Sequence, residues 1–207
     1  MSALIDDWRG HGIRITHAVV HYDETKGRHV ESNDDVVRLH FGLRGDYSVR
    51  YPELGRSFDL AGGHHNVFYA PHFQMDFVNK TTTLETFGIQ FAVDAFIGFV
   101  DGSNDELTRF CERLRRRESA ILFEEWAPLT PALETTIHQI RTCEQSAGGL
   151  NRFPQAKGRD LPKPSECAAG AWAGSWSSVY RKNARGDRVR ADTRLTSRLD
   201  LALPCRA

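Results

Sequence analysis

The chain has 207 residues, of which 40% are hydrophobic and 26% charged, and its formal net charge is zero at pH 7. This is ordinary globular composition, enough for one domain with an extension or for two small domains. The charge is unevenly divided. Residues 1–146 hold 15 Lys+Arg and 22 Asp+Glu, a net −7, whereas residues 147–207 hold 12 and 5, a net +7.

No apolar run approaches the roughly 18 residues that a membrane-spanning helix needs. The N-terminus, MSALIDDWRG, is acidic and lacks the apolar segment of a secretory signal. The four cysteines are far apart and form no CxxC pair. We therefore expect a reduced, cytoplasmic protein with incidental thiols and no membrane partner.

Short runs in which apolar and polar residues alternate predict β-strands, because successive side chains of a strand point to opposite faces. Polar residues 23–34 are interpreted as a loop. The predicted strands are 13–20, 36–43, 47–51, 58–60, 67–69, 73–77 and 85–91. Several short strands at close spacing indicate a β-sandwich or small barrel, whose interior can hold a small molecule.

After residue 91 the apolar period changes to that of helices. Residues 93–100 predict a short apolar helix, and Ser103 with Glu106 fits a capping box before a second helix. Its apolar face is Leu107, Phe110, Cys111 and Leu114. A third helix is predicted to begin at Thr130-Pro131. Its stripe, which includes Leu133, Ile137 and Ile140, can cover the chain's own sheet or pack against a second copy, and the pattern does not decide between them.

Residues 147–207 contain nine Leu, Val, Phe, Ile or Met in 61 positions, with no clear period. Low aliphatic content with positive charge predicts a disordered, basic tail. A nucleic-acid-binding arm is the alternative interpretation of its arginines, and it predicts salt-dependent binding.

Four histidines, His40, His64, His65 and His72, are the candidates for a metal site. Neighbouring residues of a strand point to opposite faces, so His64 and His65 cannot both bind one metal ion from one wall. We therefore expect no metal, with His64 and His72 as the remaining candidates, and no other cofactor. The chain has no nucleophile elbow, P-loop, GxGxxG or HExxH motif, so no catalytic residue is predicted.

The segments VVRLHFGLRGDYSVRYPELGRSFDLAGGHHNVFYAP, LETFGIQFAVDAFIGFV and ILFEEWAPLTPALETTIHQIRTCEQSAGGLNRF together resemble AraC-type transcription regulators, in the branch similar to the pyochelin-responsive regulator. The resemblance covers roughly residues 20–153. It implies a cupin-like β-barrel that binds a small effector, followed by helices that mediate dimerisation. It also implies a C-terminal domain with two helix-turn-helix units, which would bind DNA.

The resemblance ends where that DNA-binding domain would begin. Residues 158–186, GRDLPKPSECAAGAWAGSWSSVYRKNARG, show no recognition-helix pattern, and our hypothesis is therefore a truncated or frame-shifted product. The expected organisation is a cupin-like effector-binding domain over 1–100, a helical dimerisation segment over 101–150 and an aberrant basic tail over 151–207. The expected fold is mostly β, a cupin-like β-barrel or sandwich followed by two or three α-helices.

The predicted function is that of the effector-binding and dimerisation part of an AraC-type regulator, a homodimer that would bind DNA only through a further domain. The alternative is a metal-dependent cupin enzyme, a dioxygenase or isomerase. The predicted effector-binding residues are Arg38, His40, Tyr69, Phe87 and Gln90, and the predicted dimer contacts are Leu133, Ile137 and Ile140. Arg38 and His40 share one face of their strand, and Leu39 and Phe41 share the other. The pattern does not say which face lines the barrel, and Arg38 is a natural partner for an anionic effector.

Overall fold

The computed structural model describes residues 1–10, 12–100 and 105–146. The predicted basic tail and the capping box at Ser103 lie outside these residues. The strands are β1 (Ser2–Gly10), β2 (Ile13–His21), β3 (Gly27–Ser32), β4 (Val36–Arg44), β5 (Tyr47–Tyr51), β6 (Arg56–Leu60), β7 (His64–Tyr69), β8 (Phe73–Asn79), β9 (Thr83–Ala92), β10 (Ala120–Ile121) and β11 (Ala127–Pro128). The helices are a 3-10 turn (Pro52–Leu54), α1 (Val93–Val100), α2 (Asp105–Arg115) and α3 (Pro131–Ser146).

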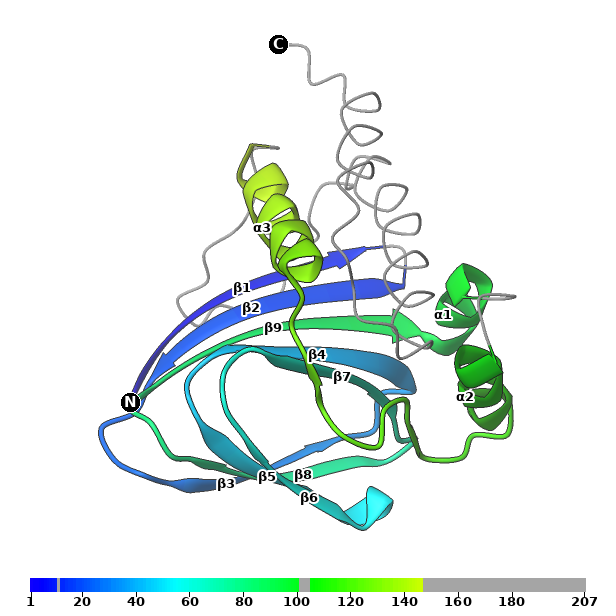
Figure 1. Ribbon diagram of the computed structural model, residues 1–207, viewed down its shortest axis with the longest axis horizontal. Helices are drawn as coiled ribbons and strands as arrows, with labels where there is room; N and C mark the ends of the chain where they lie inside the picture. The colour runs from blue at the N-terminus through cyan, green and yellow to red at the C-terminus, as the bar shows by residue number, and fades with distance from the viewer. Residues whose placement is uncertain (11, 101–104, 147–207) are drawn as a thin grey trace.

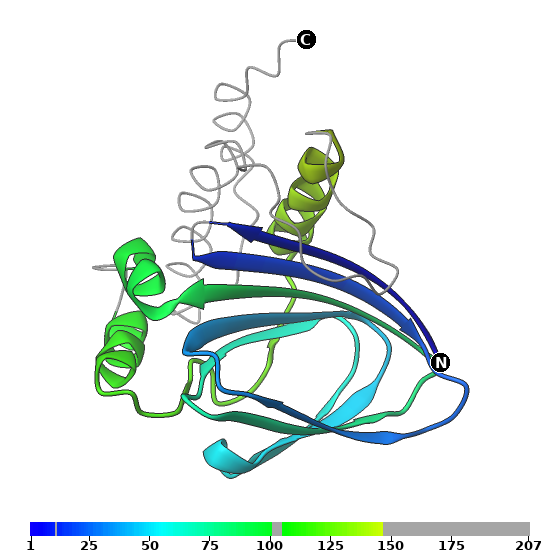
Figure 2. The ribbon, with the colours of Figure 1, turned by 180° about the vertical axis from the view of Figure 1, so that it is seen from behind.

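Two antiparallel sheets face each other, and the helices lie outside the larger one (Figure 1). The large sheet has the order β1-β2-β9-β4-β7-β10, with β11 also paired to β7, and the small sheet has the order β3-β8-β5-β6. Seen from behind, α3 lies over β1 and β2, while α1 and α2 lie near the end of β9 (Figure 2). The prediction of a mostly β sandwich followed by C-terminal helices is confirmed.

The apolar side chains form two cores, one on each side of the large sheet. We call the side that meets the helices the outer face and the side that meets the small sheet the inner face. The outer core joins Leu39 and Phe87 to helix residues such as Phe110. The inner core is mostly aromatic and holds Tyr47, Tyr51, Phe68, Phe73 and Trp126.

The two faces of β4 answer the question that the sequence pattern left open. Leu39 and Phe41 are 2% and 1% exposed in the outer core, so the apolar face of the strand meets the helices. Arg38 and His40 therefore face the small sheet, because side chains alternate along a strand. Of the two alternatives, the one that points Arg38 and His40 into the sandwich is correct.

The edge strands β1 and β3 were not predicted, and neither were the short strands β10 and β11. β3 falls within residues 23–34, which were expected to be a loop, and it pairs with β8 along its whole length. β1 pairs with β2 from Ser2 to Gly10. Residues 27–31 of β3 and 2–5 of β1 are all exposed, so neither strand needs a strong alternation of apolar and polar residues there. Their pairing comes from backbone hydrogen bonds, which leave no mark on the sequence.

The apolar stripe of helix α3 packs against the outer core of the same chain. Leu133 and Ile137 are 2% and 5% exposed in the outer core, and Ile140 packs against the same core. Thr130 caps the helix, since its Oγ1 accepts a hydrogen bond from the Leu133 amide at 3.3 Å, as predicted. The stripe therefore covers the chain's own sheet, which corrects the assignment of these residues to a dimer surface. Among the described helices, none is both long enough and apolar enough to cross a membrane.

The segment from residue 120 to residue 128 belongs to the large sheet although it follows α2 in the chain. Ala120 pairs with Tyr69 and Ala127 pairs with His65, so β10 and β11 together cover the edge of β7. The side chain of Asn66 holds the turn between them: its Nδ2 donates to the Phe123 carbonyl at 3.0 Å, and its Oδ1 accepts from the Phe123 amide at 3.2 Å. The large sheet thus includes strands from residues 1–100 and short strands from residues 101–150, the two segments that were expected to be separate.

Candidate functional site on the inner face of the large sheet

Two rows of mostly polar residues cross the inner face of the large sheet from strand to strand. The strand registers align the first row as Arg9, Arg14, Gln90, Arg38 and Phe68, on β1, β2, β9, β4 and β7. They align the second row as Asp7, Thr16, Gly88, His40 and Asn66 on the same strands. Most inner positions of a sandwich are apolar. Two adjacent polar rows therefore mark this part of the sheet as a candidate binding surface.

Gly88 leaves an opening in the second row. A Cβ placed on Gly88 would have within 4 Å only the carbonyl oxygens of Leu39, at 3.8 Å, and Thr16, at 4.0 Å, besides its chain neighbours. No side chain of the described small sheet comes within that distance of it. Gly88, Gln90 and Thr16 are half-buried rather than buried. The inner face beside His40 is therefore not covered by a side chain within 4 Å of the Gly88 Cβ position, apart from the chain neighbours of Gly88.

His40 forms one wall of this opening. A hydrogen bond of 2.9 Å joins His40 Nε2 to Tyr47 Oη, which approaches over Gly42, where a Cβ would lie only 2.9 Å from the hydroxyl oxygen. Desolvation lowers the pKa of His40 to about 4, so the imidazole is neutral near pH 7. Burial also raises the pKa of Tyr47 far above its usual value. The pair is uncharged at neutral pH and offers hydrogen-bonding groups without a charge.

Trp126 contacts His40 and has a side-chain N–H donor without an acceptor among the described residues. Its ring meets His40 edge-on at 5.5 Å between ring centroids and Phe58 at 6.1 Å. Trp126 is 8% exposed, and its buried Nε1 has no hydrogen-bond partner among the described residues. A buried N–H without an acceptor is costly, so an acceptor that reached it would stabilise the protein.

Arg38 lies on the inner face as predicted, but its guanidinium is already engaged. It donates to the carbonyls of Val36 (3.1 Å) and Asp34 (3.3 Å) and to Ser32 Oγ (3.1 Å). It also stacks 4.4 Å from the ring centre of Phe73 and is 6% exposed. Burial lowers its pKa below the usual value. These contacts give Arg38 a structural role in holding the β3–β4 connection.

The other predicted effector residues divide between the two faces. Gln90 lies beside Arg38 in the first row, half-buried and on the inner face. Tyr69 and Phe87 are 0% and 1% exposed on the outer face. Tyr69 donates a hydrogen bond to Asp35 Oδ1 at 2.7 Å, and burial with this bond raises its pKa to about 12. These two residues support the outer core and do not lie with Arg38 and His40, which corrects their place in the predicted site.

The remaining histidines have separate environments. His64 Nδ1 lies 3.1 Å from the Ala61 carbonyl oxygen, and His72 Nδ1 lies 3.2 Å from Asn33 Oδ1. His65 stacks on Phe41 in the outer core, on the other face of β7 from its neighbour His64. Within residues 1–10, 12–100 and 105–146, no three His, Cys, Asp or Glu side chains are grouped so that they could hold a metal ion.

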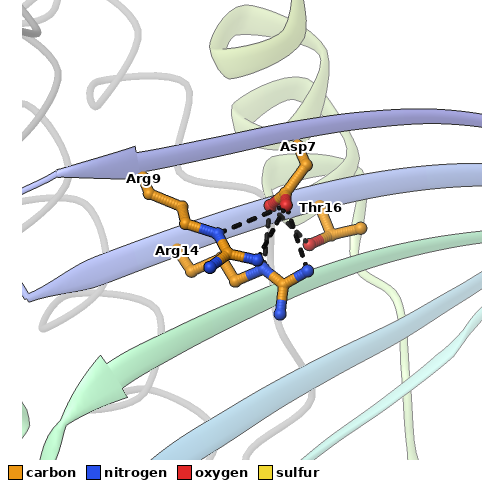
Figure 3. Close-up of polar contacts among 4 residues, drawn as sticks. All are labelled: Asp7, Arg9, Arg14 and Thr16. Atoms are coloured by element: carbon orange, nitrogen blue, oxygen red, sulfur yellow. Dashed lines mark hydrogen bonds and ion pairs between the residues drawn. The ribbon is translucent and has the colours of Figure 1, made fainter. Parts of the chain in front are cut away.

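A charged cluster on β1 and β2 was missed because β1 was not predicted (Figure 3). Asp7 accepts two hydrogen bonds from Arg14, Nε to Oδ1 at 2.8 Å and Nη2 to Oδ2 at 3.0 Å. Arg9 donates to the same Oδ2 at 3.3 and 3.2 Å, and Thr16 Oγ1 lies 3.5 Å from Oδ1. Sequence reasoning also missed Tyr47, Gly88 and Trp126 as members of the site, although a glycine inside the strand 85–91 signals open space or a close approach.

The comparisons with known proteins are weak. No family model matches the chain, and no curated protein matches it either. A cupin superfamily protein from Desulfitobacterium hafniense is similar over 44% of this chain and 77% of its own, with 15% identity and a TM-score of 0.36. An HTH_3 family transcriptional regulator from Vibrio cholerae is similar over 43% and 50%, with 14% identity and a TM-score of 0.33. A bacterial pirin from Escherichia coli, in complex with nickel(II), is similar over 44% and 52%, with 9% identity and a TM-score of 0.32.

These matches include a cupin superfamily protein and a bacterial pirin. At such scores and identities they carry no argument about activity. The function must therefore be argued from the inner face itself.

Proposed function

We propose that this chain is a small-molecule-binding domain, the effector-binding part of an AraC-type transcription regulator. The opening over Gly88 carries the proposal, because no side chain other than those of its chain neighbours comes within 4 Å of the Gly88 Cβ position. His40 is aligned with Gly88 across the two strands, and it contacts both Tyr47 and Trp126. Its walls combine aromatic rings with a few hydrogen-bonding groups, which is the usual composition of a ligand site. The resemblance of residues 20–153 to AraC-type sensor domains supports the regulatory role.

The domain acts by binding rather than by catalysis. His40 is neutral at pH 7 and bonded to Tyr47, so it serves to orient a ligand through hydrogen bonds and ring contacts. Trp126 Nε1 is the donor that a ligand oxygen would satisfy. A bound molecule would contact Trp126, which lies five residues before the start of α3. Binding can therefore affect the segment that leads into the helix.

The test fills the opening. Gly88 has no left-handed backbone angle, so Gly88→Phe places a ring over the inner face without backbone strain. Gly98→Phe is the matched control, since Gly98 lies on the exposed side of α1 with no atom within 4 Å of its Cβ position. A library of small organic compounds is screened by thermal shift against the wild type and both variants.

A true ligand at 100 times its Kd adds about 2.7 kcal/mol of stability, which raises the Tm by roughly 5–11 °C. We expect such compounds to stabilise the wild type and Gly98→Phe equally and to have no effect on Gly88→Phe. Compounds that stabilise Gly88→Phe as strongly as the wild type would place the binding site elsewhere. A library without any stabilising compound would contradict the proposed function.

A further inference from the structure

The inner faces of the two sheets carry charges of nearly one sign. Strand register places five arginines on these faces: Arg9, Arg14, Arg28, Arg38 and Arg56. Among the described strands, Asp7 is the only acidic residue that shares them. With His40 neutral, the inner faces hold a net charge of 5 − 1 = +4, although residues 1–146 as a whole carry −7.

The acidic residues of the same strands point the other way. Asp6 and Glu85 lie on the outer face of the large sheet, where both contact His17. Asp59 and Asp76 lie on the outside of the small sheet and pair there with Lys80 and Arg50. The charges are therefore sorted unevenly: the inner faces of the described strands hold five arginines and one carboxylate, whereas the other acidic residues lie outside, together with cations such as Arg50. Such sorting creates a positive potential between the sheets, and that potential favours an anion.

Not all five arginines are free to meet a ligand. Arg38 already donates hydrogen bonds to two backbone carbonyls, and its positive charge interacts with the nearby carboxylates of Asp34 and Glu53. Arg56 donates to the Glu124 carbonyl at 2.8 Å. Arg28 contacts Met1 Sδ through Nη2, and its guanidinium lies 5.5 Å from the centre of the Tyr22 ring. Arg9 and Arg14 remain, and they share the single carboxylate of Asp7, so this cluster keeps a charge of +1 (Figure 3).

The cluster also has donors to spare. Arg14 holds Asp7 through Nε and Nη2 at 2.8 and 3.0 Å. Arg9 is bound less closely, at 3.3 and 3.2 Å, and its side chain is 65% exposed. The Nη1 groups of both arginines make no hydrogen bond to another described residue in this cluster. Two adjacent guanidinium groups with unused N–H donors match a carboxylate or phosphate.

We infer that the ligand of the inner face is an organic anion, with its carboxylate or phosphate group on Arg9 and Arg14 and its body over Gly88. The strand spacing of about 4.8 Å and the two-residue step of about 7 Å place Arg14 about 8 Å from Gly88 across the sheet. That separation suits a headgroup joined to a body of one or two rings. The body would contact the aromatic wall of Tyr47 and Trp126. This inference rests on the proposed function, because it names the ligand of the same site.

The experiment separates charge from shape. The probes are aromatic carboxylates of one or two rings, each paired with its neutral carboxamide, and binding is measured by ligand-observed NMR and calorimetry. Aryl phosphates form a second set that distinguishes the two headgroups. We expect the acids to bind at least tenfold more tightly than their amides, with an advantage that shrinks as salt is added.

Two variants change the cluster in opposite directions. Arg9→Gln removes a cation from an exposed side chain and should weaken acid binding about tenfold while leaving amide binding unchanged. Asp7→Asn keeps the side-chain shape, raises the cluster charge from +1 to +2 and should tighten acid binding several-fold. Arg50→Gln, an exposed arginine on the outside of the small sheet, is the control and should change neither.

The outcomes distinguish this inference from the proposed function. Acids and amides that bind equally, with both blocked by Gly88→Phe, would overturn the anion assignment and leave the binding function standing. If Arg9→Gln and Arg50→Gln reduce acid binding to the same extent, the effect comes from the overall charge of the protein. That result would also overturn the anion assignment. If no probe of either kind binds at millimolar concentration, both ideas fail.

Discussion

Replacing Arg38 by alanine should destabilise the protein by about 3 kcal/mol. The side chain makes three hydrogen bonds, each with a net contribution of about 0.5–1.5 kcal/mol. Its stacking on Phe73 adds about 0.5–2 kcal/mol, and the cost of burying a charged group offsets part of the total. For a chain of this size, 3 kcal/mol corresponds to a Tm decrease of roughly 6–12 °C. If Arg38 served only to bind a ligand, as the sequence predicts, its replacement would leave the Tm nearly unchanged.

The free energy of unfolding is measured by urea denaturation of the wild type, Arg38→Ala, Arg38→Met and Arg50→Ala. Arg38→Met keeps the contact with Phe73 and should lose less stability than Arg38→Ala. Arg50 is exposed, so its replacement should cost no more than about 0.5 kcal/mol. An Arg38→Ala protein as stable as Arg50→Ala would refute the structural role of this arginine.

The remaining predictions concern pH, helix packing and the hydroxyl of Tyr47. The pKa of His40 falls from 6.5 to about 4 on folding, so the contribution of His40 to the free energy of unfolding is complete above pH 6.5. This contribution is lost as the pH falls towards 4, by about 3 kcal/mol in total. His40→Gln should flatten this part of the pH–stability curve, and an unchanged slope would contradict the prediction. Ile137→Glu should lower the stability seen in thermal melts by several kcal/mol, because it places a charge in the outer core. His138→Glu, on the exposed side of α3, should lower it little. A fully folded Ile137→Glu monomer would instead favour the assignment of Ile137 to a dimer surface. Tyr47→Phe should lose about 1 kcal/mol in denaturant titrations through its bond to His40, and equal stability would indicate that the bond is not formed in solution.

The alternation of residues predicted which side chains share a face but not where that face points. Arg38 and His40 were correctly grouped, and so were Leu39 and Phe41. Assigning Tyr69 and Phe87 to the face of Arg38 was wrong. Alternation within one strand does not show which residues of a neighbouring strand share its face, because that depends on the register between the strands. Tyr69 is aligned with Val37, and Phe87 with Phe41, so both share the outer face.

The candidate site depends mainly on contacts between distant segments, which one sequence does not reveal. Trp126 reaches His40 only because β10 and β11 return to the edge of β7. The Asp7 cluster requires β1, whose first residues are exposed and show little pattern. In contrast, the stripe of α3 follows from its period alone, and only its partner had to be learned from the structure.

The cover that β10 and β11 place on β7 has a consequence for folding order. Until residue 128 has been synthesised, the backbone groups along that edge of β7 have no partner, and an open strand edge invites pairing with other chains. The outer core is also incomplete at that stage, because Leu133 and Ile137 come later still. A fragment that ends at residue 100 would keep most of the strands yet expose both the edge and the apolar outer face. Such a fragment should aggregate during expression, and a chain ending near residue 146 should not.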